Sequence, residues 1–300
     1  MSLRALYGLP APAKLNLFLH VVGRRADGYH LLQSIFVLID WADTLHLERR
    51  DDGHLQRHDL GPALPDHDLC LRAARALQQA SGCTLGADVS IDKCVPWGAG
   101  MGGGSSDAAT VLLGLNRLWG LNWPRQRLQQ LALQLGADVP FFVGGGNAFV
   151  EGIGEQLTPV QLPTSLYAVV KPPQALPTNV IFGSPQLRRD TEAVILSGSL
   201  AGAPTVGGPS GDAGSGWHGF GRNDLQPVAE QHCPEVAHAA AWLQQRYGNS
   251  RMTGSGSAVF ARVGAGDQPT ATFPADELPP GWVGRLCRSL AHHPLAGWAG

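Results

Sequence analysis

Lysine is scarce in this chain of 300 residues, which has three lysines against nineteen arginines. Since arginine supplies positive charge elsewhere, we expect Lys14, Lys93 and Lys171 to do what a compact ammonium does better than a planar guanidinium. Charge of either sign is also sparse, because charged residues make up 15% of the chain and the net charge is −2. This balance offers no basic surface to a polyanion and excludes nucleic acid as an expected partner.

Long apolar runs are absent as well. Apolar runs such as those at residues 35–39 and 111–113 fall far short of the roughly 18 residues that a membrane span needs, so we expect no membrane partner. The first 20 residues have no apolar stretch behind a basic segment, which predicts a cytoplasmic protein without a secretory signal. The five cysteines are odd in number, widely spaced and without a CxxC pair, so we expect reduced thiols.

The length of the chain exceeds what one hydrophobic core usually organises and predicts two domains. We place the first at residues 1–160 and the second at residues 161–300, where a new apolar strand begins. Residues 197–216 are almost all small residues, proline and glycine, and are expected to form a mobile surface loop.

The pattern of apolar residues indicates mixed α and β structure. Strands are expected at residues 15–22 and 34–38, and a helix over residues 69–81 that a glycine ends. Alternating apolar and polar residues around Asp52-Gly53 predict a β-hairpin there.

A glycine-rich segment, VPWGAGMGGGSSDAA, occupies residues 95–109, and five of its fifteen residues are glycine. A strand is expected before it and an amphipathic helix after it, so the segment leads into a helix N-terminus. Glycines let backbone N–H groups approach a ligand, and the helix dipole favours an anion at that end. With the hydroxyls of Ser105 and Ser106, the pattern predicts a cradle for phosphates. The plainer alternative is a helix cap, which would need fewer glycines.

Other nucleotide-binding loops fit this segment less well. The run GAGMGG at residues 98–103 matches GxGxxG, but a dinucleotide site needs an acidic residue about 20 positions further on. No Asp or Glu lies between residues 108 and 137. No lysine follows the glycines, as the Walker pattern requires. Dinucleotide binding is kept as a minor alternative to triphosphate binding.

The segment PWGAGMGGGSSDAA resembles the second motif of the GHMP small-molecule kinases. Together with APAKLNLFLHVVGRRADGYH, LGADVPFFV and MTGSGSAVF, it follows the order of that family between residues 11 and 260. The four blocks narrow the resemblance to the branch that phosphorylates a cytidylated sugar alcohol in non-mevalonate isoprenoid synthesis. The resemblance implies a two-domain α+β fold with the active site in the interdomain cleft. Its N-terminal domain would be ribosomal-protein-S5-domain-2-like and would bind ATP, and its C-terminal domain would be a ferredoxin-like α/β sandwich.

The resemblance also implies transfer of the ATP γ-phosphate to the 2-hydroxyl of the erythritol unit, with Mg²⁺. Asp138 in GADVP is the expected general base, and Lys14 in PAKLN is its expected catalytic partner. An ammonium beside Asp138 would help to neutralise charge near the transferring phosphoryl group. The alternative is that Lys14 and Asp138 form only a structural salt bridge. The sequence indicates no ligand set for the metal. The residues expected to bind ATP are Lys93, near the adenine, and Pro96, Trp97, Gly98, Ala99, Gly100, Met101, Gly102, Gly103, Gly104, Ser105 and Ser106.

For the cytidine end, the resemblance implies that Tyr29, His30 and Phe182 surround the base, with Asn16 and Thr178 nearby. A pyrimidine between Tyr29 and Phe182 would gain about 1–3 kcal/mol from each aromatic partner. His30 would read the polar edge of the ring. The alternative for any of these aromatic residues is an ordinary place in the core.

Two other functions stay open on the sequence. One is another GHMP kinase with a different alcohol acceptor, and the other is a nucleotide-binding regulator without catalysis, against which the presence of both Lys14 and Asp138 argues. Asp68 stands where the family pattern usually has Asn, which leaves the hydrogen bonds on the adenine side open. The expected assembly is a monomer or a homodimer.

Overall fold

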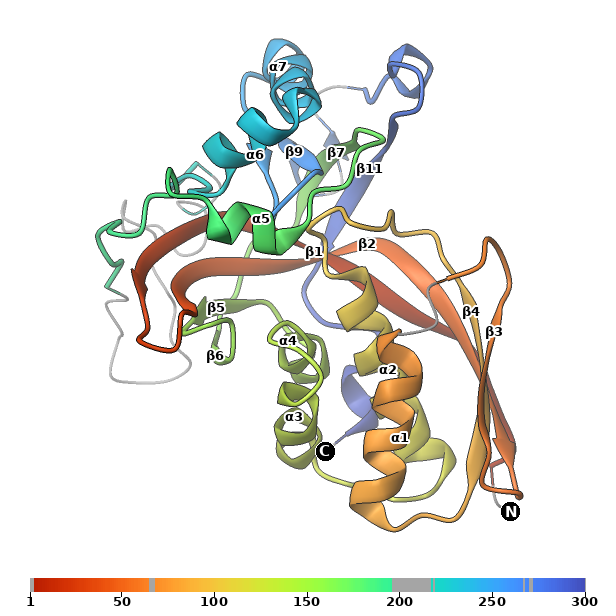
Figure 1. The fold of residues 1–300 in the computed structure, drawn as a ribbon. Coiled ribbons are helices and arrows are strands. Elements are labelled where there is room, and N and C mark those ends of the chain that lie inside the picture. The colour runs from red at the N-terminus through yellow and green to blue at the C-terminus, as the bar shows by residue number, and fades with distance from the viewer. Residues whose placement is uncertain are drawn as a thin grey trace.

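Two long antiparallel strands, β1 (Ala5–Arg24) and β2 (His30–Arg50), form the spine of the molecule. The computed structural model describes residues 3–64, 68–195, 217, 219–266, 268–269 and 272–299. In Figure 1 helices α1 to α4 lie below these two strands, and helices α6 and α7 lie above them. The spine therefore belongs to both halves.

The other elements follow in chain order. Those of the N-terminal half are β3 (Leu55–Asp59), α1 (Leu69–Ser81), β4 (Gly86–Asp92), α2 (Gly103–Leu118), α3 (Arg125–Leu133), α4 (Val139–Gly144), β5 (Ala148–Glu151) and β6 (Gln156–Pro159). Those of the C-terminal half are β7 (Ser165–Lys171), α5 (Thr178–Gly183), α6 (Gln226–His232), α7 (Pro234–Tyr247), β8 (Arg251–Met252), β9 (Val259–Ala265), β10 (Gln268–Pro269), β11 (Val283–Leu290) and the short 3₁₀ helices Ala275–Glu277 and Ala296–Trp298.

One sheet runs through both halves in the order β10-β9-β7-β11-β2-β4-β3, and β1 and β5 also pair with β2. Strand β11 makes the connection, because it pairs with β7 along most of its length and with β2 at Ser289 and Leu290. The prediction of an α+β fold is confirmed. The boundary near residue 160 and the finer domain types stay predictions.

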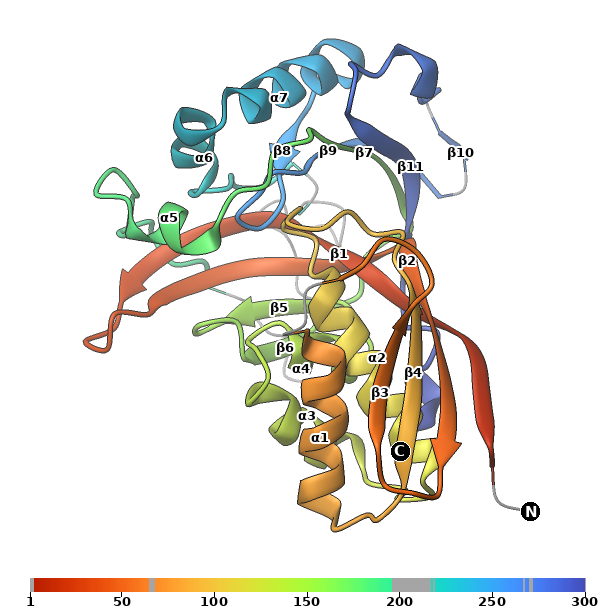
Figure 2. The ribbon, with the colours of Figure 1, turned by 45° about the vertical axis from the view of Figure 1, so that its right-hand side comes forward.

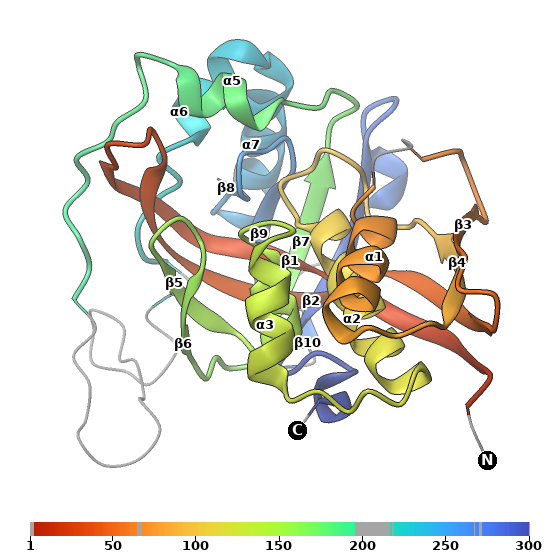
Figure 3. The ribbon, with the colours of Figure 1, turned by 60° about the horizontal axis from the view of Figure 1, so that its bottom comes forward.

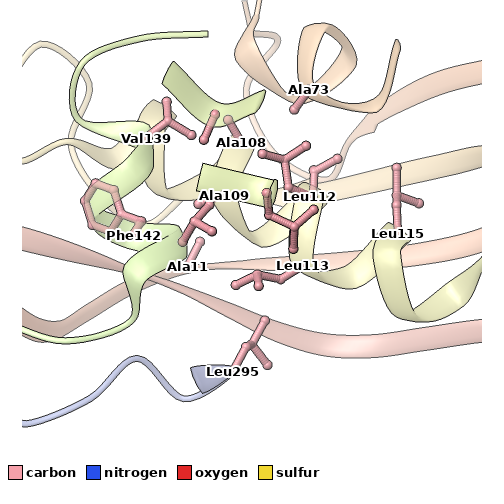
Figure 4. Close-up of a cluster of buried hydrophobic side chains, with 14 of the residues drawn as sticks. Ala11, Ala73, Ala108, Ala109, Leu112, Leu113, Leu115, Val139, Phe142 and Leu295 are labelled. Atoms are coloured by element: carbon pink, nitrogen blue, oxygen red, sulfur yellow. The ribbon is translucent and has the colours of Figure 1, made fainter. Parts of the chain in front are cut away.

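Helix α2 is the centre of the N-terminal core and is buried along nearly its whole length. Figure 4 shows its apolar side chains between those of α1, α4 and β1. Leu295, from the last residues of the chain, packs into the same cluster. Arg125 on α3 holds this last segment by donating to the carbonyl of Ala299 at 2.7 Å. The C-terminal end thus returns to the N-terminal half, as Figure 3 also shows.

The predicted hairpin around Asp52 and Gly53 is wrong. A turn does form there, with φ of +76° at Gly53, but β4 lies between β2 and β3 and pairs in parallel with β3 (Figure 2). Gly86 at the start of β4 permits this arrangement, because a Cβ atom there would lie 2.0 Å from the carbonyl oxygen of His54. The missing side chain lets β4 lie close to the turn and pair with both β2 and β3.

The helix predicted over residues 69–81 is confirmed as α1. Asp68 caps its start by accepting from the N–H of Leu71 at 2.9 Å, and Gly82 ends it in the left-handed conformation. The predicted loop at 197–216 lies outside the described residues. The five cysteines are free thiols. In the described ranges, no helix combines the length and the apolar character that a bilayer crossing requires.

Candidate functional site

The glycine-rich segment forms a bend between β4 and α2. Gly98, Gly100 and Gly102 have φ of +64°, +70° and +70°, values that side chains disfavour. A Cβ atom on Gly100 would lie 2.3 Å from the carbonyl oxygen of Thr253, and one on Gly254 would lie 2.5 Å from the carbonyl oxygen of Gly100. The two glycine-rich turns, one from each half, therefore pack backbone against backbone.

The start of α2 leaves donors free beside this bend. Gly102 caps the helix without a side-chain hydrogen bond, and in the described part of the chain the N–H groups of Gly103, Gly104 and Ser105 have no acceptor. Free N–H groups at a helix N-terminus form an anion site. The prediction for the Ser106 hydroxyl needs correction, because it is fully buried and donates to the carbonyl of Pro12 at 2.7 Å. Of the two serines, Ser105 alone lines the cavity that opens at this bend.

Lys93 lies beneath the bend in a cluster with two carboxylates. Its Nζ is 2.7 Å from Asp107 Oδ2 and also contacts Asp43 Oδ2. Asp43 Oδ1 accepts from the N–H groups of Cys94 and Val95 at 2.6 and 2.7 Å, which fixes the first residues of the bend. Burial would lower the pKa of Lys93, but the charges of Asp107 and Asp43 outweigh it and raise that pKa. Lys93 is therefore an ammonium fixed in place.

A cavity of about 360 Å³ opens above this cluster. It is lined by Lys93, by residues 95–105 and by Asp68 and Asp107. All the residues predicted to bind ATP line it except Ser106. Trp97 stands at its edge with 72% of its surface exposed. The Asp68 carboxylate is already engaged, because it caps α1 and contacts Arg57.

Lys14 and Asp138 meet beside the bend, although 124 positions separate them in the sequence. Lys14 Nζ is 3.7 Å from Asp138 Oδ2, 2.5 Å from Asn16 Oδ1 and 4.3 Å from the centre of the Phe36 ring. The Lys14 side chain is buried, whereas that of Asp138 is 32% exposed. Burial lowers the pKa of Lys14, and the Asp138 charge acts in the opposite direction. The backbone N–H of Lys14 donates to the carbonyl of Met101 at 2.9 Å, which holds β1 against the bend.

A larger cavity of about 690 Å³ begins at this pair. It shares Gly98, Gly100 and Gly102 with the smaller cavity, so the two meet at the bend. All the residues predicted for catalysis and for the cytidine end line it: Lys14, Asn16, Tyr29, His30, Asp138, Thr178 and Phe182.

The aromatic residues lie at the far end of the larger cavity. The rings of His30 and Phe182 are 5.1 Å apart and tilted by 36°, and Tyr29 is 60% exposed at the rim. Thr178 Oγ1 is 2.9 Å from Ser255 Oγ, in the second glycine-rich turn. Asn16 has different neighbours. Its Oδ1 accepts from Lys14 Nζ, and its Nδ2 donates to Ser34 Oγ at 2.9 Å. The structure thus places Asn16 beside Lys14 and Asp138 rather than beside the aromatic residues.

Sequence reasoning missed several residues of the site. Phe36 lies on β2 next to Lys14, and Ser34 lies on the same strand next to Asn16, but their place in an apolar strand gave no signal. Thr253 and Ser255 lie in the segment MTGSGSAVF, whose glycines could have indicated a second turn at the site. Burial and register, which only the fold supplies, bring these residues together.

Comparisons with known proteins point to one family. Residues 68–146 match the model of the GHMP kinases N terminal domain, and residues 212–271 match that of the GHMP kinases C terminal domain. The 4-diphosphocytidyl-2-C-methyl-D-erythritol kinase of Methylibium petroleiphilum is 64% identical over 100% of both chains. That of Variovorax paradoxus is 56% identical over 99% of this chain and 100% of its own. A crystal structure of 4-(cytidine 5'-diphospho)-2C-methyl-D-erythritol kinase is 33% identical, with a TM-score of 0.74 over 93% of this chain and 98% of that chain.

Proposed function

The chain belongs to the GHMP kinase family, and on that premise we propose that it transfers the γ-phosphate of ATP to the 2-hydroxyl of 4-diphosphocytidyl-2-C-methyl-D-erythritol. One observation carries the proposal: two cavities meet at Gly98, Gly100 and Gly102, with Lys14 and Asp138 at the junction. ATP occupies the smaller cavity, and the alcohol acceptor occupies the larger one.

The free N–H groups at the start of α2 hold the phosphates of ATP, so that the γ-phosphate faces the junction. Asp138 takes the proton from the 2-hydroxyl of the acceptor, and the oxygen attacks the γ-phosphorus. The bond from phosphorus to the β,γ-bridging oxygen breaks, and ADP leaves with that oxygen. The Lys14 ammonium offsets the negative charge that spreads over the transferring group.

A magnesium ion fits this arrangement. Mg²⁺ in kinases keeps several waters and binds mainly to the substrate phosphates, so it needs few protein oxygens. No three His, Cys, Asp or Glu side chains form a metal cage within the described ranges, and Ser105 lines the nucleotide cavity. Ser105 would contribute one ligand to an ion held by the triphosphate. When bound, the ion would neutralise phosphate charge.

The aromatic end of the larger cavity supports a cytidylated acceptor over a smaller alcohol. The Lys14–Asp138 pair and the His30–Phe182 pair line one continuous space of about 690 Å³. A sugar alcohol alone would leave its aromatic end vacant. The pyrimidine and its diphosphate link would fill the distance between the two pairs.

Release of ADP with two acceptors tests the proposal. With ATP and Mg²⁺, we expect kcat/KM for the cytidylated acceptor to exceed that for free methylerythritol by at least about 30-fold, as two stacking contacts of about 1 kcal/mol each would give. Equal rates with the two acceptors would contradict the assignment of the larger cavity and favour a GHMP kinase for a different alcohol.

A further inference from the structure

Arg189 joins the two walls of the larger cavity. Its Nε donates to Nε2 of His30 at 2.9 Å, where β2 begins. Its Nη2 donates to the carbonyls of Phe182 and Ser184 at 3.1 and 2.8 Å, at the end of α5, and its Nη1 donates to the carbonyl of Leu187 at 2.9 Å. One guanidinium therefore holds both the His30 ring and the backbone that carries the Phe182 ring.

This contact decides where His30 carries its proton. A guanidinium donates hydrogen bonds and accepts none, so Nε2 of His30 must be the acceptor. Burial lowers the pKa of His30, and the charges of Arg189 and Arg24 lower it further, which favours the neutral ring. A neutral imidazole that accepts through Nε2 has its proton on Nδ1. In the described part of the chain Nδ1 has no partner, and His30 lines the cavity.

We propose that Arg189 is a positioning residue that fixes His30 as a hydrogen-bond donor through Nδ1, and so makes the cavity select cytosine over uracil. The inference rests on the proposed function, which puts a pyrimidine in this cavity. Ring nitrogen N3 of cytosine has a lone pair and accepts a hydrogen bond. The same nitrogen of uracil carries a proton, so two donors would face each other.

Arginine is suited to this task because its planar fork places several donors in a rigid arrangement. Lysine could reach one or two of the four acceptors but would not hold them in one plane. The neighbouring Arg188 has no such place, because it is exposed and pairs with the exposed Asp190. It provides a matched control one residue away.

Nitrogen-15 NMR of histidine-labelled protein without substrate tests the tautomer directly. We expect the His30 signals, assigned by their loss in His30→Gln, to show a protonated Nδ1 and an unprotonated Nε2 at neutral pH. A protonated Nε2 would overturn the proposal. This measurement uses the wild-type fold and does not depend on the activity of the enzyme.

Kinetics with cytidylated and uridylated acceptors test the consequence. We expect Arg189→Met to lower the ratio of their kcat/KM values about 10-fold or more, mainly through KM, because His30 can then adopt either tautomer. Arg188→Met should leave the ratio unchanged. An unchanged ratio in Arg189→Met would refute the positioning role, whereas a wild-type enzyme inactive on both acceptors would refute the proposed function instead. If Arg189→Met does not fold, the His30 tautomer measured by NMR in the wild type alone tests the proposal.

Discussion

The two carboxylates beside Lys93 are not equivalent. The charge of the Asp43 carboxylate is compensated by Lys93 and by the backbone N–H groups of Cys94 and Val95. Asp107 shares the same ammonium, and in the described part of the chain its Oδ1 has no hydrogen-bond partner. Burial raises the pKa of Asp107, and the charge of Asp43 acts in the same direction, against the attraction of Lys93. The cluster therefore carries one carboxylate that resists ionisation.

This asymmetry predicts a pH-dependent effect of Asp107→Asn on stability. The folded chain holds the Asp107 proton more tightly than the unfolded chain, so the resulting stabilisation is present at low pH and is lost as the pH rises through the raised pKa. We expect the free energy of unfolding of Asp107→Asn, relative to wild type, to improve from about pH 4 to about pH 8. Urea denaturation at several pH values measures it.

The control for this prediction is Asp43→Asn. This substitution removes the negative charge that pairs with Lys93 and weakens the acceptor of two backbone N–H groups. It should destabilise the protein by about 1–3 kcal/mol. A difference between Asp107→Asn and wild type that stays constant over the pH range would show that Asp107 is ionised throughout.

At the residue scale, the sequence predicted the residues that belong to motifs. Lys14 and Asp138 were found because the resemblance supplied both, and the structure places them 3.7 Å apart. The Ser106 hydroxyl was assigned to the phosphates because the sequence does not show which side of a helix faces Pro12. Arg189 could not have been found, because its partners lie on β2 and α5 and only the fold brings them together.

At the scale of elements, the contact between the two glycine-rich turns sets the shape of the junction. Gly100→Ala would force a side chain against the Thr253 carbonyl at a positive φ. We expect it to lower the free energy of unfolding by roughly 2–4 kcal/mol, from the strained backbone and the overpacking together. The measurement is thermal or urea unfolding.

Gly104→Ala is the comparison for Gly100→Ala. No atom lies within 4 Å of a Cβ added at Gly104, and its φ is not positive, so its stability should stay close to that of wild type. If both variants lost the same stability, the close packing of the two turns would not be what requires glycine at position 100.

The elements also show where sequence patterns mislead. Helix α1 was predicted correctly because both of its end signals are local, at Asp68 and Gly82. The hairpin prediction at Asp52-Gly53 failed because strand pairing depends on a distant segment: β4, which starts at Gly86, lies between the two expected partners. A turn signal fixes the turn and does not fix the partner of the strand that follows.

At the scale of the whole molecule, the two halves are joined by more than a linker. Strand β11 pairs with β7 and with β2, and Leu295 after it packs in the N-terminal core. The second glycine-rich turn reaches from the C-terminal half to the bend at Gly100. Both cavities therefore depend on the return of the chain to its N-terminal half, which composition and motif spacing do not reveal.

A single-turnover measurement on Asp138→Asn tests most directly whether Asp138 acts as the base. The amide keeps the size of the side chain but cannot take the proton of the acceptor hydroxyl, so we expect transfer of the γ-phosphate to slow by at least about 100-fold. Binding of ATP, measured by isothermal titration calorimetry, should be unchanged because Asp138 lines only the larger cavity. A transfer rate near that of wild type would contradict the role of Asp138 as the base.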